Sequence, residues 1–254
     1  MIYVGTAGWS VPKIAAESFP QEGTHLDKYA AVLNAVEINS SFYRDHQAKT
    51  YKKWADATPE HFKFSVKLNK RFTHSKDFEF DADDLKECLT GIKGLGDKWG
   101  VLLIQFSAGK KFNTKRVEIL YKNVRKVFKG HVALEARNLQ WMSEESLELM
   151  KKYNISKVTA DPEKCLGEVD GSIQYYRLHG SPLIYKSDYT TEYLNELYKE
   201  MKEHDGDVWC IFDNTQYGHA TNNAVAILNK GEPYERHQRF HGSETNSMHA
   251  LNEH

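Results

Sequence analysis

The sequence has only three cysteines, and their spacing excludes the usual cysteine-based architectures. Cys88, Cys165 and Cys210 are far apart, form no CxxC pair and are odd in number. This pattern indicates neither a disulfide framework nor a zinc ribbon. A reducing compartment is the simplest interpretation, so we expect a cytoplasmic protein.

The sequence also lacks net charge and long apolar runs. Lys and Arg total 34 and Asp and Glu total 35, which gives a formal net charge of −1. This balance is not typical of a dedicated binder of nucleic acid or of anionic membranes. No run approaches the roughly 18 apolar residues of a membrane-spanning helix, and the opening MIYVGTAGWS has no signal-peptide pattern. We therefore expect a soluble protein without a membrane partner.

The composition that is present suits a single globular core. The chain has 254 residues, of which 40% are hydrophobic and 12% aromatic, and this excludes a wholly disordered protein. No linker divides residues 1–230, which we expect to form one domain. Residues 231–254 are polar, and we expect a flexible tail there in preference to a metal site. Its histidines are His237, His241, His249 and His254.

Short β-rich runs alternate with stretches of helical periodicity along the chain. The run GVLLIQF is almost wholly hydrophobic, which is typical of strands buried on both faces of a parallel sheet. Eight such units predict a single TIM (β/α)8-type barrel. An open doubly wound sheet is the alternative, but no GxGxxG motif follows an early strand. The predicted strands are Ile2–Gly5, Ala35–Ile38, Phe62–Val66, Trp99–Gln105, Val132–Glu135, Lys157–Ala160, Tyr175–Leu178 and Val208–Phe212.

The helical stretches carry apolar stripes and capping residues. Ser143 stands where an N-cap is expected, and a stripe at helical spacing also follows Thr190 and Thr191. Two further apolar stripes predict helices. One stripe comprises Tyr29, Leu33 and Val36, and the other comprises Val117, Leu120, Val124 and Val127.

Polar residues gather at the carboxyl ends of the predicted strands. In an α/β barrel these ends meet at one mouth, where the chemistry is built. Any one of these residues could belong to a structural ion pair, such as Glu37–Lys67 or Glu135–Arg177. Core stability does not require so many at one end, so the set indicates a functional site. Its members are Glu37, Lys67, Gln105, Glu135, Arg137, Asp161, Arg177, His179, Asp213 and Asn214.

A series of motifs resembles the YecE-like family, also called domain of unknown function 72. In order, the motifs read GTAGWS, VEINSSFYR, TPEHFKFSVK, TH, LLIQFS, LEARNLQW, RLHG and IFDN, and the resemblance spans roughly residues 2–229. It implies a TIM-barrel fold and no defined activity. The segments VPKIAAESFP and Asp213-Asn214-Thr215 depart from the family pattern. The matching positions are Glu37, Asn39, Tyr43, Lys67, His74, Glu135, Arg137, Arg177, His179 and Asn223.

Four residues are candidates for catalysis. Glu37 and Glu135 could divide acid and base roles, as paired carboxylates do. His179 could act as a general base or a metal ligand, and Lys67 could be a nucleophile if burial lowered its pKa. The alternative for each is a structural hydrogen bond or ion pair.

A second group of residues suits ligand binding. Arginine forks bind carboxylate or phosphate, and aromatic faces such as Tyr217 suit a sugar or base. The candidates are Trp9, Asn39, Tyr43, Arg44, His74, Gln105, Arg137, Trp141, Arg177, Asp213, Asn214 and Asn223. No cofactor is evident. Binding of a divalent metal remains open, because an oxygen-rich set of side chains suits Mg²⁺ or Mn²⁺. The members of this set are Glu37, Glu135, Asp161, His179 and Asp213.

Three functions remain open from the sequence. The first is an enzyme (a hydrolase, lyase or isomerase) that acts on a small anionic or polyhydroxylated molecule by carboxylate and histidine acid–base chemistry. The second is a metal-assisted phosphodiester hydrolase on nucleic acid, favoured only by a basic run that we expect on a solvated helix face. The third is a non-catalytic ligand-binding protein. The basic run comprises Lys110, Lys111, Lys115, Arg116, Lys122, Arg125, Lys126 and Lys129.

Overall fold

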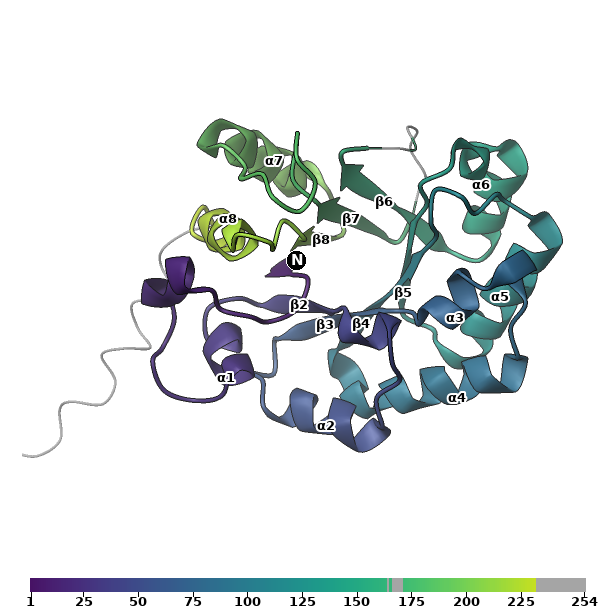
Figure 1. Ribbon diagram of the computed structural model, residues 1–254, viewed down its shortest axis with the longest axis horizontal. Coiled ribbons are helices and arrows are strands. Elements are labelled where there is room, and N and C mark those ends of the chain that lie inside the picture. The colour runs from purple at the N-terminus through teal and green to yellow at the C-terminus, as the bar shows by residue number, and fades with distance from the viewer. Residues whose placement is uncertain (164, 166–170, 232–254) are drawn as a thin grey trace, which may run out of the picture.

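Eight parallel strands form a nearly closed barrel with helices on its outside (Figure 1). The computed structural model describes residues 1–163, 165 and 171–231. The strands are β1 (Ile2–Thr6), β2 (Ala35–Ile38), β3 (Lys63–Lys67), β4 (Trp99–Gln105), β5 (His131–Glu135), β6 (Ile155–Asp161), β7 (Ile173–Leu178) and β8 (Asp207–Phe212). They are hydrogen-bonded in the order β1-β8-β7-β6-β5-β4-β3-β2. The predicted single α/β barrel is confirmed.

Helices lie between consecutive strands, as is usual for parallel pairing, except between β6 and β7, where the described residues form no helix. The α-helices are α1 (His25–Ala30), α2 (Ala48–Asp56), α3 (Lys70–Thr73), α4 (Ala82–Ile92), α5 (Thr114–Val127), α6 (Glu144–Lys152), α7 (Thr191–Glu203) and α8 (His219–Leu228). Short 3₁₀ helices are η1 (Lys13–Ser18), η2 (Ser40–Phe42), η3 (Lys76–Phe78), η4 (Lys93–Lys98) and η5 (Leu139–Met142). No helix in the described part of the chain is long and apolar enough to span a membrane.

The predicted helix signals hold in most places and fail in one. Ser143 and Thr190 accept hydrogen bonds from backbone N–H groups of the turns that follow them, so both are N-caps. The stripe through Tyr29, Leu33 and Val36 is not one helix, because α1 ends at Ala30 and Val36 belongs to β2. The Tyr29 hydroxyl instead forms hydrogen bonds with the backbone of β1 and β2. Residues 232–254, with the four tail histidines, lie outside the described residues.

Side chains close the barrel where β1 meets β2. These strands share one isolated bridge, between Ala7 and Glu37. Below it, Asn34 accepts a hydrogen bond from Val4 N at 2.7 Å and donates one to Ile2 O at 2.9 Å. Tyr29 Oη accepts from Thr6 N at 2.8 Å and donates to Ala35 O at 3.0 Å. These bonds satisfy backbone N–H and C=O groups that would otherwise be paired by regular hydrogen bonds between the two strands.

A glycine permits this close approach of the two strands. A Cβ atom on Gly5 would lie 2.0 Å from Ala35 O. Real Cβ contacts are never that short, so glycine alone fits here without moving a strand.

The barrel interior changes from apolar to polar toward the mouth. Strand side chains alternate between two faces, so a residue two positions after an interior residue also faces the interior. The apolar interior cluster comprises Ala35, Val101, Leu103, Ala133, Val158, Ile173, Tyr175, Trp209 and Ile211. Two positions after an interior residue on their strands come the residues that we call the polar layer, each 7% exposed or less: Glu37, Lys67, Gln105, Glu135, Arg177 and Asp213.

Candidate functional site

Arg177 is the centre of the polar layer. Its side chain is 1% exposed and binds Glu37 with two nitrogens, Nε to Oε2 at 3.0 Å and Nη2 to Oε1 at 2.8 Å. Nη1 donates to Glu135 Oε2 at 2.9 Å, and Nη2 lies 3.0 Å from Asp213 Oδ2. One guanidinium therefore pairs with three buried carboxylates, and each of them would be costly to bury without a partner.

Glu37 faces this guanidinium and a tyrosine. Its Oε2 also accepts a hydrogen bond from Tyr175 Oη at 3.2 Å, and the residue is fully buried. Because Arg177 lies between Glu37 and Glu135, the two carboxylates do not face each other across an open mouth. The structure shows the Glu135–Arg177 pair, and no ion pair joins Glu37 to Lys67 within the described residues.

His179, just after β7, links the polar layer to a pocket. Its Nδ1 lies 3.0 Å from Asp213 Oδ2, and its Nε2 lies 3.2 Å from Glu135 Oε1. Burial lowers the pKa of His179, but the hydrogen bonds to Asp213 and Glu135 outweigh burial, so the pKa is raised above its ordinary value. The imidazolium form donates to both carboxylates.

The carboxylates of this group stay ionised. Burial alone would raise the pKa of Glu135, but Arg177, His179 and Arg137 hold it well below its usual range. The pKa of Asp213 is also lowered, since Arg177 and His179 outweigh its burial. Both groups are therefore hydrogen-bond acceptors at neutral pH.

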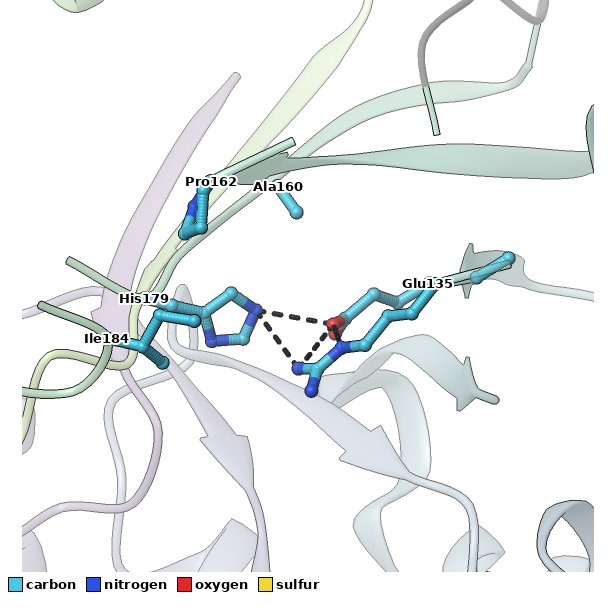
Figure 2. A pocket seen from close by; sticks show the side chains of 7 residues that line it. Glu135, Ala160, Pro162, His179 and Ile184 are labelled. Atoms are coloured by element: carbon cyan, nitrogen blue, oxygen red, sulfur yellow. Dashed lines mark hydrogen bonds and ion pairs between the residues drawn. The ribbon is translucent and has the colours of Figure 1, made fainter. Parts of the chain in front are cut away.

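A pocket opens on this group at the carboxyl ends of the strands. Figure 2 shows the His179 ring and the Glu135 carboxylate pointing toward each other beside Ala160, Pro162 and Ile184. Arg137 donates from Nε to Glu135 Oε1 at 2.7 Å, and its side chain is 28% exposed. The lining residues are Glu135, Ala136, Arg137, Ala160, Pro162, His179 and Ile184. The pocket thus combines an acid–base group, a carboxylate and an accessible guanidinium on an apolar wall.

Cations surround the neighbouring part of the mouth. His74, after β3, is half-buried, and its ring lies 5.1 Å from the Phe42 ring. Burial lowers the pKa of His74, and four nearby cations lower it further: Lys67, Lys110, Arg137 and Lys70. This side of the mouth therefore favours an anion.

The predicted asparagines brace a loop beside the pocket. Asn214 donates to Ser187 O and to Asn223 Oδ1, both at 2.9 Å, and Asn223 donates to Asp188 Oδ1 at 2.8 Å. These bonds hold residues 181–188, which include the pocket residue Ile184. The buried Oδ1 atoms of Asn39 and of Asn214 have no hydrogen-bond partner in the described part of the chain. Gln105 lies in the polar layer, paired in register with Glu135.

The predicted aromatic faces do not form one surface. Trp141 is fully buried, with its ring 4.2 Å from that of Phe106, so it belongs to the core and offers no open face. Trp9 packs edge-on against Trp54 at 5.0 Å. Tyr43 and Tyr217 are exposed at 69% and 57%. Arg44 is also exposed.

Most of the basic run lies away from the pocket. Its residues Lys115, Arg116, Lys122, Arg125 and Lys126 are on α5, on the outside of the barrel (Figure 1). Arg125 binds backbone carbonyl oxygens of the following loops. Only Lys110, before α5, contributes to the cationic part of the mouth.

The carboxylates do not form a metal-binding group. In residues 1–163, 165 and 171–231, no three His, Cys, Asp or Glu side chains have a metal-binding arrangement. The Arg177 guanidinium occupies the space among Glu37, Glu135 and Asp213.

Sequence reasoning missed several residues of the site. The apolar wall of Ala136, Ala160, Pro162 and Ile184 carries no chemical signal. Tyr189 bonds to Asp161 Oδ2 at 2.7 Å and accepts from Gly180 N at 2.7 Å, so it ties the ends of β6 and β7 together. Strand alternation could have found Ser65 and Tyr175, which face the interior beneath the polar layer.

The comparisons with known proteins agree on the family. The family model described as "Protein of unknown function DUF72" matches residues 3–246. The UPF0759 protein YunF of Bacillus subtilis (strain 168) is 27% identical in an alignment that covers 90% of this chain and 94% of YunF. The relative's name states no activity.

Solved structures show the same fold. A DUF72 family protein from Enterococcus faecalis has a TM-score of 0.73 at 23% identity, covering 90% of this chain and 94% of that protein. A D-allulose 3-epimerase from Methylomonas sp., in complex with D-allulose, has a TM-score of 0.51 at 12% identity, covering 89% of this chain and 94% of the epimerase. At these identities the likeness concerns the fold alone. Because the family model spans nearly the whole chain, the protein belongs to the YecE-like family of unknown function, DUF72.

Proposed function

We propose that the protein is an enzyme that moves a proton on a small anionic, hydroxyl-bearing molecule bound in the pocket. The hydrogen bonding of His179 carries this proposal. Asp213 accepts from Nδ1, which leaves Nε2 as the atom that gains and loses the proton. When Nε2 is protonated, Glu135 Oε1 accepts from it, and when it is not, Arg137 Nη2 at 3.4 Å can donate to it. A general acid–base group needs such support in both states.

The guanidinium and the surrounding cations support an anionic substrate. Arg137 is the partly exposed arginine of the pocket, and its planar fork suits a carboxylate or phosphate. Glu135, held ionised, accepts hydrogen bonds and would accept one from a substrate hydroxyl. Arg137 and Glu135 would thus orient the molecule against His179.

Proton transfer is tested by deuterium exchange. Sugar phosphates and 2-hydroxy acids are incubated with the protein in D₂O, and carbon-bound deuterium is followed by NMR. We expect exchange with one class, lost in His179→Gln. Exchange should also rise as the pH rises through the raised pKa of His179, because only the neutral imidazole can accept a proton from carbon.

Anion binding is tested separately with inorganic phosphate by calorimetry. We expect Arg137→Met to weaken binding about tenfold or more, the equivalent of one charge-assisted hydrogen bond. Arg116→Met, on α5 outside the barrel, is the matched control and should bind like the parent. Phosphate binding without exchange for any substrate would contradict catalysis and favour a ligand-binding protein.

A further inference from the structure

Lys67 places an amine inside the barrel at the level of the polar layer. Ser65 Oγ lies 2.8 Å from Tyr175 Oη across the interior, so Ser65 faces the barrel axis. Alternation along β3 makes Lys67, two residues later, face the same interior one layer nearer the mouth. Lys67 is 7% exposed, which leaves a narrow contact with solvent.

This amine has no polar partner. In the described part of the chain, no group forms a hydrogen bond or ion pair with Lys67 Nζ. It lies 4.3 Å from the centroid of the Phe42 ring. The three carboxylates of the polar layer are already bonded to Arg177, and Glu135 is also bonded to Arg137 and His179. Each carboxylate thus has a closer cationic partner than Lys67.

The surroundings bring the pKa of this amine closer to neutral pH than that of an ordinary lysine. Burial is the largest cause that lowers the pKa of Lys67, and Arg177 lowers it further, to about 8. Glu37, Glu135 and Asp213 act in the opposite direction without restoring the ordinary value. Lys67 and the half-buried His74 also repel each other when both are charged. A desolvated lysine beside another cation is the known route to an amine that attacks carbonyl groups.

We propose that Lys67 Nζ forms a covalent imine with the carbonyl carbon of a small anionic aldehyde or ketone bound at the mouth of the barrel. This inference rests on the proposed function, which brings the anion to the mouth, and it narrows the substrate class to carbonyl compounds.

The chemical step is balanced by loss of water. The nitrogen lone pair forms the N–C bond while the carbonyl electron pair moves to oxygen, which takes a proton and gives a carbinolamine. The hydroxyl then takes a second proton, the C–O bond breaks, and water leaves. The nitrogen loses its two original protons overall, and no oxidant or reductant is consumed.

Reductive trapping with glyoxylate tests the imine. Glyoxylate is a small anionic aldehyde, and cyanoborohydride reduces its lysine imine to a stable carboxymethyl-lysine that peptide mass spectrometry locates. Lys63, at the opposite end of β3, is the matched control within the same molecule. At about pH 7 we expect Lys67 to be labelled at least about tenfold faster than Lys63, since a lower pKa leaves more neutral amine. Labelling of Lys67 that is equal or slower overturns the proposal.

A variant separates this inference from the proposed function. Lys67→Arg keeps a cation but cannot form an imine. We expect it to bind inorganic phosphate like the parent and to lose deuterium exchange. Exchange retained in Lys67→Arg would overturn the imine while leaving the proposed function intact. The proposed function fails by a different result, namely unchanged exchange and phosphate binding in His179→Gln and Arg137→Met.

Discussion

At the scale of single residues, the buried charged side chains of the polar layer differ in how many oppositely charged groups they contact. Arg177 contacts three carboxylates, whereas Lys67 contacts an aromatic ring and no acceptor in the described part of the chain. Burial of a charge is favourable only when its partners replace the lost water. The two cations should therefore have opposite effects on stability.

Removal of Arg177 should be severely destabilising. In Arg177→Met, three buried carboxylates lose their shared cation, and we expect the free energy of unfolding to fall by about 3–5 kcal/mol. Arg71→Met is the control, because Arg71 binds Asp45 and Asp84 with its side chain 33% exposed, and it should cost about 1 kcal/mol or less. Urea unfolding measures both, and equal losses would contradict the central role of Arg177.

Removal of Lys67 should stabilise the protein in a pH-dependent way. The folded chain releases the Lys67 proton at about pH 8, and an unfolded lysine does so near its ordinary value of 10.5. Below pH 8 the folded state carries the full cost of the buried charge, about 3 kcal/mol, and this cost disappears as the pH rises toward 10.5. Lys67→Met should therefore be more stable than the parent at about pH 7 and similar to it above about pH 10.5. Urea unfolding at both pH values would refute this if the difference stayed constant.

At the scale of elements, the contact between β1 and β2 depends on side chains. One bridge joins the strands, and Asn34 and Tyr29 supply the other hydrogen bonds. These bonds form only if the backbones come close enough, and Gly5 permits that distance. A short strand contact of this kind is sensitive to a single methyl group.

Gly5→Ala should open this contact. The new Cβ would lie 2.0 Å from Ala35 O, so a strand must move, at a cost of about 3 kcal/mol. Thermal unfolding should show a Tm lower by roughly 2–4 °C for each kcal/mol. Gly109→Ala is the control, since a Cβ there meets nothing within 4 Å. If the Gly5→Ala protein were as stable as the Gly109→Ala protein, the contact between β1 and β2 would accommodate the extra methyl group without loss of stability, contrary to this prediction.

At the scale of the whole molecule, the sequence predicted the barrel because its strands are nearly continuous apolar runs. The predicted and observed bounds coincide for Ala35–Ile38 and Trp99–Gln105. Strand-end polarity identified the residues of the polar layer. It could not show that Arg177 separates Glu37 from Glu135, because the order of side chains across a barrel depends on its curvature and not on spacing along the chain. Trp141 is not an open ligand face for the same kind of reason, since the rings of Phe78, Phe106 and Phe112 pack against it.

The pairing of β1 with β8 has a consequence for synthesis on the ribosome. β1 forms its ladder with β8, through residues such as Val4 and Cys210, and has one isolated bridge to β2. β1 is synthesised before the other seven barrel strands, and its main hydrogen-bonding partner, β8, is synthesised last. Contacts between segments so distant in sequence form slowly, and an unpaired strand edge is prone to associate with other chains. The nascent chain is thus most exposed to aggregation between the synthesis of β1 and that of β8.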